Sequence, residues 1–171
     1  EEFQKVGYPV LTQDSLPLDP DILDRLFGDD VEKGLVKDPL DIADAWKNSY
    51  SENTTRKVWA AKFTARHPNL VALELSSFKC GHDAPIYTVV EEVVEHSGTP
   101  YFCFKDIDEN KPTGSIKIRL ETMHYFLTRY REDKLKEGKK LSDIAEELRL
   151  YEESLRKELD SLPYQPDVIS L

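Results

Sequence analysis

Two short apolar runs, separated by one helical repeat, restrict the fold of this chain more than any other part of its sequence. The runs lie at residues 70–75 and 100–104, and each has the length and apolar content of a buried strand. Between them, the apolar residues of 86–94 recur at spacings of three and four, which favours a helix. A strand, a helix and a strand within about 30 residues make one βαβ unit. The sequence therefore predicts an α/β fold with a parallel sheet and helices on its faces.

Further helices and one further strand are expected on both sides of this unit. A short apolar run after Gly7 predicts a first strand at residues 8–12. Helical spacing and helix-start residues predict helices at 21–27, 38–48, 53–66 and 116–130. Gly28 is placed to end the first of these helices, and Gly98 is placed to end the helix over 86–94.

The last part of the chain has a different pattern. From Leu141 to Leu162, apolar residues recur at three- and four-residue steps among many Lys and Glu residues, which is typical of a long amphipathic helix. We therefore divide the chain into an α/β domain at residues 1–131 and a helical extension at residues 132–171. The extension is expected to cover the α/β domain or to bind a partner, and the helix from Leu141 to Leu162 could form a homo-oligomer.

Composition and charge exclude some functions. Lys and Arg number 23 against 33 Asp and Glu, and the net charge of −10 repels nucleic-acid phosphates and anionic membranes. Cys80 and Cys103 are the only cysteines, and the sequence has neither a signal-peptide pattern nor an apolar span of membrane length. We therefore expect a reduced, cytoplasmic setting. The sequence does not begin with Met, and residues 1–7 are typical of the end of a helix, so a longer parent protein is expected.

The loop after the first run of the βαβ unit could carry chemistry. It holds Cys80, Gly81, His82 and Asp83 between a predicted strand and the start of a predicted helix. The positive end of the helix dipole favours the thiolate form of Cys80, which binds metals or acts as a nucleophile. Gly81 allows close approach of the backbone to a ligand. The plainer alternative is that Cys80 is a small buried apolar residue and that His82 and Asp83 cap the helix.

Two later loops carry charged and small residues. Asp106 and Asp108 follow the second predicted strand, and they could bind a cation, orient a ligand or cap a helix. Gly114 and Ser115, with Arg119 nearby, could bind an anion at a helix start, although Ser115 as a simple N-cap is the commoner role. Cys103 is expected to be structural because it lies inside a strand. An iron–sulfur cluster needs three or four thiolates, so any cluster here takes ligands from outside this chain.

These residues resemble a known family. The segments 78–87, 98–101, 106–110 and 114–122 are similar, in this order, to the C-terminal part of the 2-hydroxyacyl-CoA dehydratase activase-related proteins. They also resemble the last subdomain of the dehydratase subunits and of the double-cubane cluster proteins. The resemblance runs from about residue 7 to about residue 130, and residues 46–119 are its most specific part.

The resemblance implies a fold, a cofactor and a setting. The fold is a flavodoxin-like or Rossmann-like three-layer sandwich with a long C-terminal helix. Cys80 matches the C-terminal cluster cysteine of an iron–sulfur cluster whose other ligands come from upstream domains of the same polypeptide. The parent protein is linked to CoA-ester dehydratase or ATP-dependent reductase chemistry in anaerobes, with an acyl-CoA as substrate. The isolated chain is not expected to be active or to keep the cluster.

The resemblance also gives the neighbouring residues a role. It places His82, Asp83, Asp106 and Asp108 around the cluster ligand. Gly114, Ser115 and Arg119 then help to form an adjacent anion site or an interdomain surface.

Two other functions remain open. The apolar run that ends in Asp106 and Asp108 is similar to the Asp-x-Asp signature of phosphohydrolases, in which one carboxylate attacks phosphorus and the other acts as acid and base. Asn110 departs from that signature, which has Thr or Val at this place. The second is a docking domain without a cofactor, which binds neighbouring domains or subunits through its acidic surface and the C-terminal helix.

Overall fold

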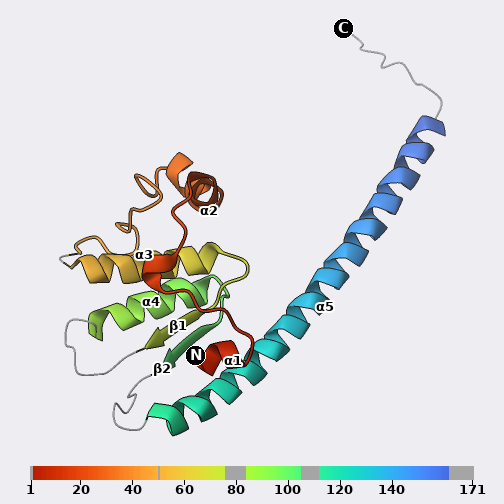
Figure 1. Cartoon of the computed structure of the whole chain (residues 1–171). Helices are drawn as coiled ribbons and strands as arrows, with labels where there is room; N and C mark the ends of the chain where they lie inside the picture. Colours follow the sequence, from red (N-terminus) through yellow and green to blue (C-terminus); the bar gives the residue numbers. More distant parts are fainter. Residues whose placement is uncertain (1, 50, 76–83, 105–111, 162–171) are drawn as a thin grey trace. The chain divides into compact units, whose positions relative to one another are not determined.

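The computed structural model describes residues 2–49, 51–75, 84–104 and 112–161 of the chain. The chain divides into two compact units, Glu1–Met123 and His124–Leu171, which we call the N-terminal and the C-terminal unit. The elements, in chain order, are α1 (Glu2–Lys5), the 3₁₀ helix η1 (Gln13–Ser15), α2 (Pro20–Glu32), α3 (Glu52–Arg66), β1 (Ala72–Leu75), α4 (Ala84–His96), β2 (Tyr101–Phe104) and α5 (Pro112–Ser161) (Figure 1).

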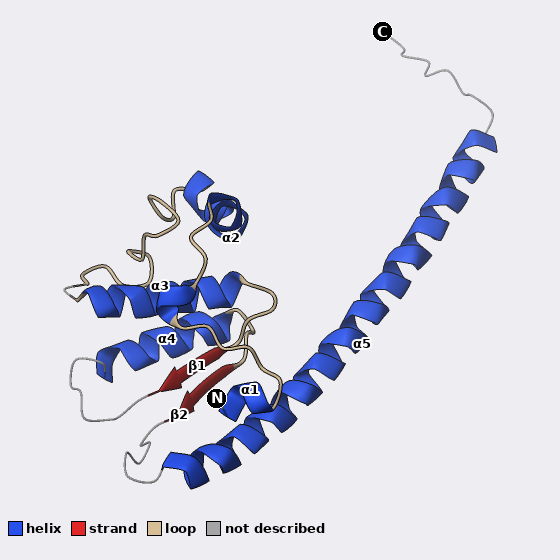
Figure 2. Cartoon of the chain, viewed as in Figure 1, coloured by secondary structure: helices blue, strands red, loops and turns tan. Residues whose placement is uncertain are grey.

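The predicted βαβ unit is confirmed. β1 and β2 are parallel, and α4 lies between them in the chain, as Figure 2 shows. Ala72 is paired with Tyr101 at the start of the strands, and Leu75 is paired with Phe104 at their end. Within the described residues the sheet has these two strands, so the structure is a mixed α and β fold with a small parallel sheet and a long C-terminal helix.

Two helix boundaries follow from the sequence as expected. α3 ends at Arg66, because Pro68 disfavours helical backbone at the residue before it. α4 ends at His96, and Gly98 has φ +73, a left-handed conformation that favours glycine just beyond a helix.

The predicted end of α2 is wrong. The helix starts with Asp19, whose carboxylate accepts hydrogen bonds from the N–H groups of Asp21 and Ile22, and it continues through Gly28 to Glu32. Gly34 lies just beyond the helix and has a left-handed φ of +68°, so it has the helix-ending role that was expected of Gly28. The later stop places a buried aromatic residue, Phe27, in the middle of the helix.

The strand predicted at residues 8–12 is also wrong. This run is irregular and leads into η1, and Val10 and Leu11 are each 52% exposed. The hydroxyl of Ser15 accepts a hydrogen bond from the Thr12 N–H at 2.7 Å and donates one to the Thr12 carbonyl at 2.9 Å. These local bonds bend the chain where a strand would need bonds to a neighbour.

Turns replace the helix predicted at residues 38–48. The carboxylate of Asp38 accepts a hydrogen bond from the N–H of Leu40 at 2.8 Å, and Asp41 accepts one from the N–H of Ala43 at 2.9 Å. Asp side chains compete in this way with the helical bonds of the backbone. The turns still bury Ile42 and pack Ala45 and Trp46 against the core, while Leu40 is 49% exposed.

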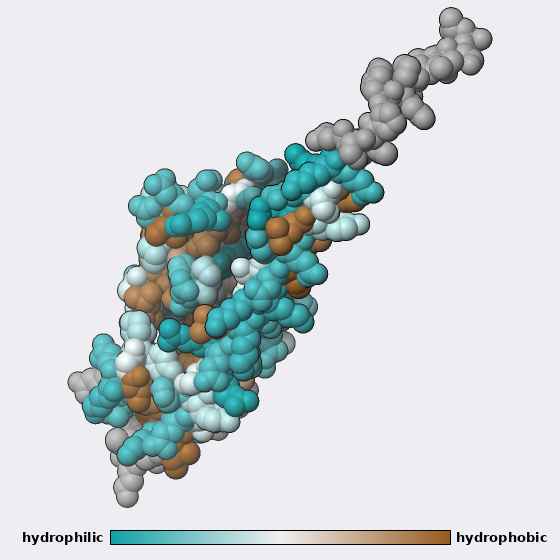
Figure 3. Space-filling view, turned by 90° about the vertical axis from the view of Figure 1, so that its right-hand side faces the viewer, coloured by the Kyte–Doolittle hydropathy of each residue, from teal (hydrophilic) through white to brown (hydrophobic). Residues whose placement is uncertain are grey.

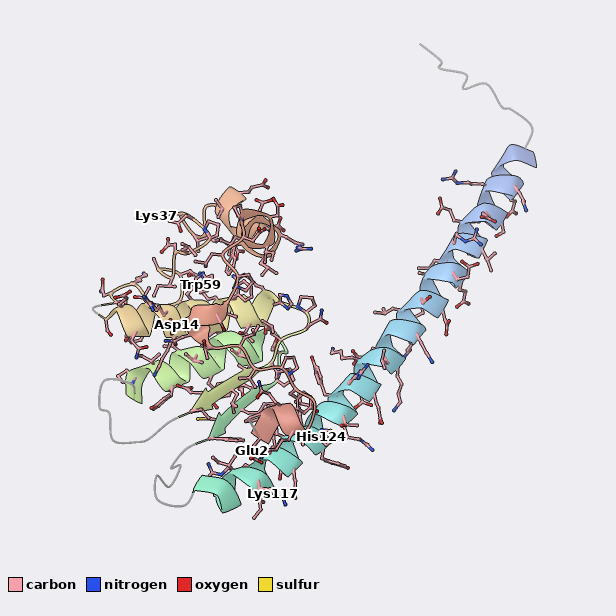
Figure 4. All side chains as sticks on the ribbon, in the orientation of Figure 1. Glu2, Asp14, Lys37, Trp59, Lys117 and His124 are labelled. Atoms are coloured by element: carbon pink, nitrogen blue, oxygen red, sulfur yellow. The ribbon has the colours of Figure 1, made fainter. Side chains whose placement is uncertain are left out.

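The core of the N-terminal unit lies between α2, α3 and α4. Trp59, labelled in Figure 4, lies on α3, and its indole N–H donates a hydrogen bond to the carbonyl of Pro39 at 3.0 Å. The buried cluster consists of Leu23, Phe27, Ile42, Val58, Trp59, Ala61, Phe63, Ile86, Val90 and Val94. Ala72 and Tyr101 of the sheet pack against this cluster, so one face of the sheet contacts the core.

The C-terminal unit is helical from His124 to Ser161, within α5. The helix predicted at 116–130 and the helix predicted from Leu141 are therefore parts of one continuous helix. Figure 3 shows apolar side chains among hydrophilic ones on the part of α5 next to the grey C-terminal residues.

Candidate functional site

The carboxyl ends of β1 and β2 are the edge at which the sequence predicts a site. Leu75 and Phe104, the last residues of the two strands, are paired in register. Adjacent strands lie about 5 Å apart, so the two strand ends lie side by side. The predicted site residues Cys80, Gly81, His82, Asp83, Asp106 and Asp108 lie outside the described residues. Their roles, including the Asp-x-Asp reading, stay predictions.

Arg119 is the predicted site residue that the structure places against the sheet. Its guanidinium carbon lies 5.7 Å from the centroid of the Phe104 ring, in the geometry of a cation–π contact. The Phe104 ring also stacks with Phe3 of α1 at 6.1 Å between centroids. A cation therefore lies beside the last residue of β2, on the edge where the Asp106 segment begins.

Ser115 is not an N-cap, so that expectation is wrong. α5 begins at Pro112, which puts Gly114 and Ser115 inside its first turn. Pro is common at the start of a helix because its missing N–H is not needed there. Ser115 is exposed, and its predicted anion-binding role stays a prediction.

A polar group on the sheet was not anticipated from the sequence. The Tyr101 hydroxyl donates a hydrogen bond to the carboxylate of Glu74 at 2.5 Å. Glu74 is paired across the strands with Cys103, two residues beyond Tyr101, so all three side chains lie on one face of the sheet. Burial, the hydrogen bond to Glu74 and the negative charge of Glu74 raise the pKa of Tyr101. In the sequence, the one sign of this polar pair was the position of Glu74 inside the apolar run 70–75.

The raised pKa of Tyr101 predicts an alkaline titration. Tyrosine normally loses its proton near pH 10. In the folded chain we expect Tyr101 to keep its proton above that pH. Because the folded pKa is the higher one, the stabilisation linked to this proton is complete below about pH 10 and declines as the pH rises further.

Ultraviolet absorbance of tyrosinate checks this expectation. Near pH 11, folded wild-type chain and folded Tyr101→Phe should contain equal amounts of tyrosinate, and unfolding should reveal one more in the wild type. An extra tyrosinate in the folded wild type would show that Tyr101 ionises normally.

A cavity of about 290 Å³ runs along β1. Its lining includes five consecutive residues, Val71 to Leu75, together with residues of α3 and of the segment 11–16. Successive side chains of a strand point to opposite faces, so a cavity that touches all five follows the edge of the strand. The lining combines apolar residues with polar ones, which are Thr12, Gln13, Lys57, Thr64, Glu74 and Tyr101.

A second cavity, of about 440 Å³, has a charged lining that includes Asp30, Asp44, Lys62 and Arg66. Lys62 has a side chain that is 1% exposed, and its Nζ contacts Asp44 Oδ1 at 2.6 Å and the Asp41 carbonyl at 2.7 Å. Arg66 contacts Asp30 at 2.5 Å. Each of these charges is neutralised by a neighbour, so we assign the network to stability and not to catalysis.

Comparison of the chain with protein-family models, with curated proteins and with solved structures found no match. Across the described ranges, no group of three or more His, Cys, Asp and Glu side chains is arranged to hold a metal ion. In the same ranges, no helix combines the length and the apolar character needed to span a membrane.

Proposed function

We propose that this chain is the C-terminal domain of a larger protein related to the 2-hydroxyacyl-CoA dehydratases and their activases. In this proposal Cys80 provides one ligand to an iron–sulfur cluster used in low-potential, ATP-coupled electron transfer. The observation that carries it is the in-register end of the parallel strands at Leu75 and Phe104. Ligand sites of parallel α/β folds lie at the carboxyl ends of the strands. The Cys80 segment and the Asp106 segment both start there.

The cysteine count defines what this chain can contribute. It has two cysteines, fewer than the three or four thiolates that an iron–sulfur cluster needs. Cys103 lies within β2, paired with Glu74, and so it belongs to the sheet and not to the loops at its end. The remaining ligands are therefore proposed to come from upstream domains of the parent polypeptide.

Other residues receive supporting roles in the same proposal. His82, Asp83, Asp106 and Asp108 surround the cluster ligand, and Arg119 with Gly114 and Ser115 forms an adjacent anion or interdomain surface. The cation of Arg119 beside Phe104 supports this role. The two strands are proposed to belong to a flavodoxin-like or Rossmann-like three-layer sandwich in a cytoplasmic protein. An acyl-CoA is the proposed substrate of the parent protein.

Replacing Cys80 by serine in the parent polypeptide tests the cluster assignment. Anaerobic iron and sulfide analysis, with electron paramagnetic resonance, should show that Cys80→Ser loses most of the cluster, because serine is a poor substitute for a thiolate ligand. Cys103→Ser is the matched control and should keep the wild-type iron content.

Two results would contradict the proposal. One is an unchanged cluster in Cys80→Ser, and the other is an equal loss in both variants, which would indicate a general effect on folding. The isolated chain provides a further check, since it should bind no stable cluster even after anaerobic reconstitution with iron and sulfide.

A further inference from the structure

We draw no further inference here: the strongest candidate, the exposed apolar face of α5 formed by Leu141, Ile144, Leu148, Tyr151 and Leu155, carries nothing, because no feature of the described part of the chain shows what covers it.

Discussion

Replacing Lys62 by alanine is expected to lower the free energy of unfolding of the N-terminal unit by about 3 kcal/mol. The Lys62 side chain is 1% exposed, and its ammonium group binds both the Asp44 carboxylate and the Asp41 carbonyl. The variant leaves these two acceptors without their cation and removes a packed side chain. Because the Asp44 side chain is 32% exposed and can recover water, the cost lies at the low end for a broken buried pair.

Denaturant unfolding followed by tryptophan fluorescence measures this cost. The two tryptophans of the chain, Trp46 and Trp59, both lie in the N-terminal unit, so the signal reports on that unit alone. Lys33→Ala is the control, because Lys33 is 65% exposed and pairs with Asp29 only at 3.6 Å. The control should change stability by no more than about 0.5 kcal/mol. Equal effects of the two substitutions would contradict the structural role of Lys62.

Phe27→Ala is expected to destabilise the same unit by about 4 kcal/mol. The Phe27 side chain is 1% exposed, so alanine leaves a large cavity between α2 and α3. The Arg66 guanidinium lies 4.8 Å from the ring centroid, and the Lys62 ammonium lies 5.9 Å from it. The ring therefore also stabilises two cations of the charged network.

Phe27→Leu separates volume from aromaticity. Leucine keeps most of the apolar volume and loses the ring face, so the expected cost is about 1.5 kcal/mol. The same fluorescence-detected unfolding gives both values. A loss with leucine as large as the loss with alanine would mean that the cation contacts, and not the cavity, dominate at this position.

The sequence predicts the βαβ unit because the strand patterns, the helix pattern and the stop signals all indicate the same elements. Apolar runs of strand length flank a helix with regular spacing. Pro68 ends the helix before the unit, and Gly98 follows the helix within it. Elsewhere the patterns conflict. Residues 38–48 have helical spacing, but the carboxylates of Asp38 and Asp41 bind backbone N–H groups and form turns.

The candidate site was predictable only in part. Residue types and strand ends could indicate the Cys80 and Asp106 segments, because chain order alone places them after the strands. The contact between Tyr101 and Glu74 depends on the register of β1 against β2. A register is a tertiary property, so a single sequence does not reveal it. The burial of Lys62 was missed for the same reason, since its acceptors lie about twenty residues away in the chain.

Glu74 also affects the tendency of the chain to aggregate while it is being synthesised and has not yet folded. β1 leaves the ribosome before β2, and until then Val71 to Leu75 is an apolar segment without its partner strand. Such segments aggregate by strand pairing between molecules. A carboxylate within the segment opposes this pairing, because stacked copies would bring like charges together. The group that binds the Tyr101 hydroxyl in the finished fold thus also lowers the risk of aggregation during synthesis.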